Sequence, residues 1–137
     1  MMTKERIIFS TKVLEIGAES ADFKSIGMAV LFGDEAPDAL RPSCFIIEVV
    51  PISEQITAGM KLEVDNQVYQ ITAVGGEVQT NLGRLGHTAI SFTGAKEAKL
   101  PGTLYVEQGD YPDFKVGSVV RITVSYTHLT LPTICSV

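Results

Sequence analysis

The sequence predicts an all-β domain, a barrel or sandwich crossed by one short helix. Short runs of β-branched and aromatic residues recur along the chain, and Gly, Pro, Asn and Asp punctuate them. An Asp-Asn pair separates two of these runs, as in a tight hairpin, and only one segment has clear helical periodicity. The 137 residues suit a single domain with a substantial core.

Three strands are expected in the first half of the chain, at residues 6–16, 27–33 and 44–50. The third, CFIIEVV, is nearly all apolar and stops at Pro51, so we expect it to be the most buried strand. A hairpin follows, in which Asp65 and Asn66 adopt the left-handed conformations of the turn. Three further runs complete the set, at residues 87–94, 102–109 and 117–124.

Helical pattern is confined to residues 77–86, EVQTNLGRLG. The spacing of Val78, Leu82 and Leu85 puts these side chains on one helix face, and Gly86 is placed as a C-terminal stop. A single turn is also expected within EAPDALRP. The helix therefore connects the hairpin to the strand that begins near residue 87.

Composition and charge exclude several partners. Sixteen acidic against eleven basic residues give a net charge of -5, without a Lys/Arg cluster, which argues against binding nucleic acid or an anionic membrane surface. No apolar run approaches the roughly 20 residues that cross a bilayer. The N-terminus lacks the apolar region and cleavage site of a signal peptide. We therefore expect a cytoplasmic protein without direct membrane insertion.

No cofactor or metal site is expected. The two cysteines, Cys44 and Cys135, are too few for a disulfide framework and are not spaced as zinc ligands, and Cys44 is interpreted as a core residue. The acidic residues Asp34, Glu35 and Asp38 surround a proline in a loop, where we expect them to be solvated.

The glycine pair Gly75-Gly76 precedes the expected helix and raises the alternative of an anion-binding nest. Glu77 follows at once, and its carboxylate would repel a phosphate. The stretch also lacks the phosphate-loop pattern G-x-x-x-x-G-K-[ST]. A turn is therefore the preferred interpretation.

The C-terminal segment, residues 125–137, contains no Asp, Glu, Lys or Arg and is dense in Thr, Leu and Pro. It follows a strand whose expected end is Val124. We interpret residues 1–124 as the domain and residues 125–137 as a non-native tail, with an ordinary terminal strand as the alternative. This interpretation removes His128 and Cys135 from the candidate functional residues.

His87 opens the run HTAISF, whose alternation assigns it a side. Ile90 and Phe92 share the face that suits the core, so His87 lies on the more polar face, directly after the helix stop. One interpretation is an accessible imidazole with a neutral nitrogen free to react. The other is a histidine that hydrogen-bonds the backbone at the helix end, and physics alone favours this second interpretation.

The fragments EIGAES, EAPDAL, CFI, ITAVG, NLGRLGH, PGT and VGSVVRI occur in the order typical of one family. The chain resembles the glucitol/sorbitol-specific enzyme IIA proteins of the bacterial phosphoenolpyruvate-dependent sugar phosphotransferase system. The resemblance covers about residues 7–122, and NLGRLGH with the downstream PG is its most specific part.

The resemblance implies a compact β-barrel of short, mostly antiparallel strands with one short helix. It also implies a phosphocarrier that accepts a phosphoryl group on histidine from the histidine-containing phosphocarrier protein. The group then passes to the sugar-specific enzyme IIB, and the sugar is phosphorylated during import through the membrane component IIC. Both a monomer and a homodimer are compatible with this resemblance.

The chain departs from the family at the expected acceptor. The family's phosphoryl-accepting histidine directly follows CFI, and here that residue is Ile47, whose side chain has no lone pair. His87 matches the family's second histidine, in LGH, and is either a supporting residue or a substitute acceptor. Two hypotheses remain: a working phosphocarrier that uses His87, and a non-catalytic regulatory or binding relative.

Overall fold

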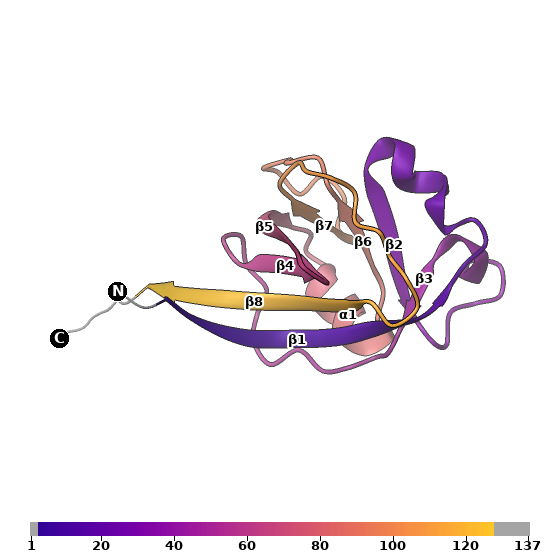
Figure 1. Cartoon of the computed structure of the whole chain (residues 1–137), viewed down its shortest axis with the longest axis horizontal. Coiled ribbons are helices and arrows are strands. Elements are labelled where there is room, and N and C mark those ends of the chain that lie inside the picture. Colours follow the sequence, from indigo (N-terminus) through magenta and orange to yellow (C-terminus); the bar gives the residue numbers. More distant parts are fainter. Residues whose placement is uncertain (1–2, 128–137) are drawn as a thin grey trace.

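The computed structural model describes residues 3–127 of the chain, and strands dominate that part (Figure 1). The strands are β1 (Thr3–Ile16), β2 (Met28–Gly33), β3 (Phe45–Ile47), β4 (Lys61–Val64), β5 (Gln67–Val74), β6 (Thr88–Ser91), β7 (Thr103–Val106) and β8 (Val119–Thr127). The helices are α1 (Val78–Leu85) and two 3₁₀ helices, η1 (Ser20–Ile26) and η2 (Arg41–Ser43). The all-β prediction is confirmed.

The strands follow one another in the order β1-β3-β2-β6-β7-β5-β4-β8, and β8 pairs with β1 to close a ring. Most neighbouring pairs are antiparallel, as expected, but β2–β3 and β6–β7 are parallel. The ring is uneven, because β3 has 3 residues and β1 has 14. Figure 1 shows β1 and β8 running together beyond the ends of the other strands.

The predicted hairpin and the predicted helix end are both present, but the hairpin prediction is wrong in one detail. The β4–β5 hairpin turns at Asp65, which has a φ of 53°, and Val64 pairs with Gln67 across the turn, whereas Asn66 does not adopt the expected left-handed conformation. Helix α1 ends at Gly86, which takes the left-handed conformation with a φ of 69°. Leu85 differs from the prediction because it is 48% exposed, so the buried face of the helix is shorter than its periodicity suggests.

Strands β2 and β3 bury side chains on both of their faces. Phe45 and Ile47 lie in the interior core of the ring, whereas Ile46 between them lies in a second cluster on the outer face. This outer cluster comprises Phe32, Ala36, Cys44 and Ile46, with Val30 packed against it. A strand covered on both sides has no polar face, which explains why CFII lacks alternation.

The expected strand at residues 44–50 is therefore buried, but it is shorter than predicted. Strand β3 ends at Ile47, and both Glu48 and Val49 are exposed. All residues of β3 are buried, but so are all residues of β7, so the prediction that this strand is the most buried one is only partly confirmed.

Strand β8 continues to Thr127, beyond the end expected at Val124. Its last residues pair with the start of β1, where Thr127 lies opposite Thr3. Residues 128–137, with His128 and Cys135, lie outside the described part of the chain. Within residues 3–127, none of the helices has the length and apolar character that crossing a membrane requires.

Candidate functional site around His87

His87 lies between the end of α1 and the start of β6. The Gly86 N–H donates to the Leu82 carbonyl at 3.1 Å, and the His87 N–H donates to the Asn81 carbonyl at 3.2 Å. These bonds satisfy carbonyls of the last helical turn and fix the backbone of His87. Ile90 and Phe92 are buried in the interior core, as the alternation predicts.

The imidazole of His87 is half-buried against β2. Its ring stacks on the Phe32 ring, with 4.3 Å between centroids and 27° between planes. Its Nδ1 lies 3.2 Å from the carbonyl oxygen of Leu31. The ring therefore bonds the backbone, but the backbone of β2 rather than that of the helix end.

This contact determines the proton position on the neutral ring. A carbonyl oxygen only accepts hydrogen bonds, so Nδ1 must be the donor and carry the proton. Nε2 then holds the lone pair, and it makes no hydrogen bond to any residue in the range 3–127. Phe32 covers a face of the ring, whereas the lone pair lies in the ring plane at its edge. The geometry suits a nucleophilic Nε2.

The backbones of β2 and the helix end approach closely beside this ring. A Cβ on Gly33 would lie 2.4 Å from both the Leu85 carbonyl oxygen and Val49 Cγ2. A Cβ on Gly86 would lie 3.0 Å from Gly33 Cα. Only glycine at both positions allows this approach. Leu31, Phe32 and Gly33 are not identified by the sequence, because no local pattern shows which strand lies beside His87.

Ile47 is placed away from this imidazole. It has 0% exposed surface, lies in the interior core, and pairs with Val13 of β1 and Gly33 of β2. Phe32, on which His87 stacks, belongs to the cluster on the opposite face of the sheet. The structure therefore does not bring the side chains of the two sequence-predicted site residues together.

Cys44 is a core residue, as the sequence suggests. Its side chain is 2% exposed, and its thiol donates to the Leu40 carbonyl at 3.2 Å. Burial raises the pKa of this thiol, which lowers the thiolate fraction. Cys44 is therefore unsuited to act as a nucleophile.

The acidic loop is exposed, and one of its members is ion-paired. Arg41 contacts Asp34 at 3.2 Å and Glu15 at 3.0 Å. The hydrogen bond from Arg41 lowers the pKa of the Glu15 carboxyl. Glu35 and Asp38 are exposed. Among the described residues, no group of three or more His, Cys, Asp and Glu side chains is arranged to hold a metal ion.

The glycine pair before α1 forms a turn. The Glu77 N–H donates to the Pro101 carbonyl at 2.8 Å, and the Val78 N–H donates to the Gly75 carbonyl at 3.1 Å. Two of the amide groups that would form an anion nest are therefore already bonded to carbonyls. The interpretation as a turn is confirmed.

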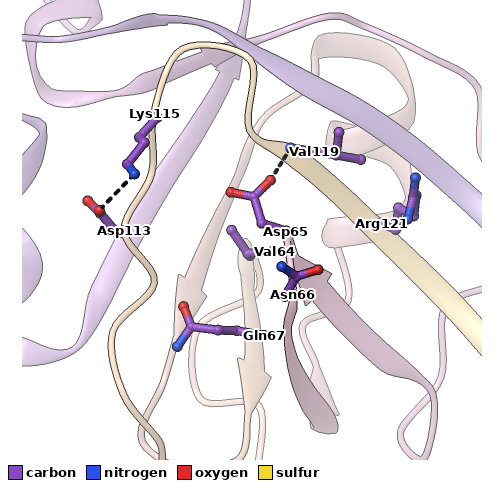
Figure 2. A pocket seen from close by; sticks show the side chains of 8 residues that line it. All are labelled: Val64, Asp65, Asn66, Gln67, Asp113, Lys115, Val119 and Arg121. Atoms are coloured by element: carbon purple, nitrogen blue, oxygen red, sulfur yellow. Dashed lines mark hydrogen bonds and ion pairs between the residues drawn. The ribbon is translucent and has the colours of Figure 1, made fainter.

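A pocket of about 620 Å³ lies between the β4–β5 turn and the start of β8. Figure 2 shows Asp65 near its centre, with its carboxylate directed at the Val119 N–H, and Lys115 paired with Asp113. The ring order places β4 and β8 across from β2 and β6. The pocket is lined by Val64, Asp65, Asn66, Gln67, Asp113, Lys115, Val119 and Arg121. With no histidine or cysteine in its lining, it is separate from the His87 site.

Comparisons with known proteins agree with one another. The family model "PTS system glucitol/sorbitol-specific IIA component" matches residues 8–121. The glucitol/sorbitol-specific EIIA component of Shigella flexneri is 33% identical over 115 residues, which are 84% of this chain and 94% of that protein. The corresponding protein of Escherichia coli matches with the same identity and coverage.

A solved structure supports the fold. The crystal structure of a PTS system IIA component from Enterococcus faecalis superposes with a TM-score of 0.72, and the match covers 82% of this chain and 97% of that one. Its sequence identity is 24%, so this likeness supports the fold alone. The family-model match and the two relatives carry the assignment: this chain belongs to the glucitol/sorbitol-specific IIA components of the sugar phosphotransferase system.

Proposed function

We propose that this chain is a cytoplasmic phosphocarrier that holds the phosphoryl group on Nε2 of His87. Its donor is the histidine-containing phosphocarrier protein, and its acceptor is the sugar-specific enzyme IIB, which serves the membrane component IIC. One observation carries the proposal: the bond from Nδ1 to the Leu31 carbonyl assigns the ring proton to Nδ1 and leaves the Nε2 lone pair for attack.

The transfer needs little further machinery. The Nε2 lone pair forms a bond to phosphorus while the P–N bond of the donor's phosphohistidine breaks, and that electron pair returns to the donor's nitrogen. The proton on Nδ1 of His87 stays in place, hydrogen-bonded to Leu31. The neutral ring needs no general base, because its proton is on Nδ1 and Nε2 carries none. Delivery to enzyme IIB repeats the step with the chain as donor.

The second candidate function is a non-catalytic relative that keeps the fold and binds its partners without carrying phosphate. The observation in its favour is Ile47, an aliphatic residue with 0% exposure at the position of the expected acceptor. Under this alternative His87 is a structural residue that joins the end of α1 to β2.

Phosphorylation in vitro separates the two candidates. The chain is incubated with phosphoenolpyruvate, enzyme I and the histidine-containing phosphocarrier protein, and its intact mass is measured. We expect one acid-labile phosphoryl adduct that is absent in His87→Ala and retained in the control variant His128→Gln. A parent chain without an adduct would favour the non-catalytic candidate. An adduct that persists in His87→Ala would refute His87 as the acceptor.

A further inference from the structure

We infer that three consecutive residues of β2, Leu31, Phe32 and Gly33, form a cradle that sets the tautomer and orientation of His87. Within this cradle, Phe32 and Gly33 are positioning residues, acting through the imidazole. Their importance for phosphoryl transfer rests on the function proposed above, whereas their effect on the tautomer does not.

The first part of the cradle is the Leu31 carbonyl. The ladder between β2 and β6 ends with Leu31 paired to Thr88, and His87 is the next residue beyond it. The imidazole donates from Nδ1 to the carbonyl of this last paired residue. A free histidine side chain in water favours the proton on Nε2, so this bond reverses the ordinary preference.

The second part is the Phe32 ring. It is 9% exposed and packed in the outer cluster with Cys44 and Ile46, and the imidazole stacks on it. Stacking fixes the plane of the imidazole, and the Leu31 carbonyl selects which edge faces the backbone. A flip of the ring would put a carbon at the carbonyl and lose the hydrogen bond.

The third part is the glycine contact. A Cβ on Gly33 would clash with the Leu85 carbonyl oxygen and with Val49 Cγ2, each of which would be 2.4 Å away. Any larger residue at position 33 would push the end of α1 away from β2, and His87 follows that end directly. The distance from Nδ1 to Leu31 therefore depends on glycine at position 33.

The consequence for chemistry is that the Nε2 lone pair points away from the Leu31 carbonyl, because the two nitrogens lie on different edges of the imidazole. In-line transfer between two proteins tolerates little misplacement of the attacking atom, because displacements of about 1 Å can lower rates about 100-fold. The cradle thus provides both the correct proton position and a defined line of attack.

Nitrogen-15 spectroscopy of the ring tests the inference directly. Uniformly labelled His128→Gln protein leaves His87 as the one histidine of the 137-residue chain. In the neutral ring we expect Nδ1 to be protonated and Nε2 unprotonated. In the same background, Phe32→Leu and Gly33→Ala should shift the ring towards the tautomer of free histidine. We also expect phosphorylation by the histidine-containing phosphocarrier protein to slow at least about tenfold.

Gly83→Ala is the matched control. It makes the same substitution in α1, but its Cβ would meet only Ile52 Cδ1 and Cγ1, at 3.7 and 3.9 Å, which are ordinary contacts. We expect it to keep the parent tautomer and rate. If Gly33→Ala does not fold, as judged by thermal unfolding, Phe32→Leu decides.

Folded Phe32→Leu or Gly33→Ala protein with the parent tautomer would overturn the inference. A parent chain that has the expected tautomer but accepts no phosphoryl group would refute the proposed function and leave the cradle intact. The two failures are therefore distinguishable.

Discussion

Ile47 and His87 lie on opposite sides of the same sheet. The Ile47 side chain is in the interior core, and the His87 ring stacks at 4.3 Å on Phe32, a member of the outer cluster. In this backbone conformation, the side chain at position 47 points into the core enclosed by the strands. A side chain at position 47 and the imidazole of His87 therefore cannot both face the same phosphoryl donor unless β3 moves.

This relationship predicts the outcome of Ile47→His. The substitution removes apolar contacts and buries a polar imidazole in the interior core, so the free energy of unfolding should fall by about 3 kcal/mol. Urea unfolding measures the loss. We expect no phosphoryl adduct beyond that on His87. Ile47→Val is the control, with an expected loss of about 1 kcal/mol. A second adduct at unchanged stability would show that β3 can turn this side chain outward.

Asp65 joins the β4–β5 turn to the start of β8 (Figure 2). Its carboxylate accepts from the buried Ser118 hydroxyl at 2.9 Å and from the Val119 N–H at 3.0 Å, while its φ is 53°. Asp65→Ala loses both acceptors and keeps the left-handed strain, so we expect a loss of about 2–3 kcal/mol in urea unfolding.

Asp65→Asn is the informative comparison for this turn. It retains one carbonyl acceptor and a residue type that tolerates the left-handed conformation. We expect its loss to be clearly smaller than that of Asp65→Ala. Equal losses in the two variants would mean that the negative charge, rather than the turn and its hydrogen bonds, stabilises this region.

Truncation tests the domain boundary proposed at residue 124. The hydrophobic core extends along β8 as far as Val124, and the family-model match ends at residue 121. Deleting residues 125–137 should therefore lower the free energy of unfolding by less than about 1 kcal/mol. A control that lacks only residues 128–137 keeps the full length of β8. A large loss in the longer truncation alone would show that the end of the β1–β8 pair stabilises the ring.

Tyr111 predicts a stability change at alkaline pH. Its hydroxyl donates to the Met28 carbonyl at 3.1 Å, and burial raises the pKa of Tyr111 from 10.0 to about 12. Because the folded phenol holds its proton to higher pH than the unfolded one, its contribution is complete below pH 10 and is lost as the pH rises towards about 12.

The measurement compares the parent with Tyr111→Phe, which does not titrate at this position. Below pH 10 the variant should be less stable by about 1 kcal/mol through the lost hydrogen bond. The stability difference between parent and variant should shrink between pH 10 and 12. In the variant, the absorbance titration of phenolate should lack the component at the highest pH. A stability difference that stays constant to pH 12 would contradict the prediction.

The sequence by itself determined the elements that short-range forces specify. The turn at Asp65, the helix ending at Gly86, and the core side of Ile90 and Phe92 all follow from backbone conformational preferences and side-chain alternation over a few residues. The order of short motifs in the sequence indicated the glucitol/sorbitol-specific IIA family, and the family model and the curated relatives confirm it.

The tertiary structure alone decided which strands meet. Strand β3 is apolar on both sides, so no alternation could assign Ile47 to the interior and Ile46 to the outer cluster. The proton position on His87 depends on Leu31, which is 56 residues away in the chain. Strand order and parallel pairing come from burial and hydrogen bonding between distant segments, which local propensity does not encode. For that reason the sequence could identify His87 as a candidate residue, whereas only the tertiary structure could determine which of its two nitrogens is free to react.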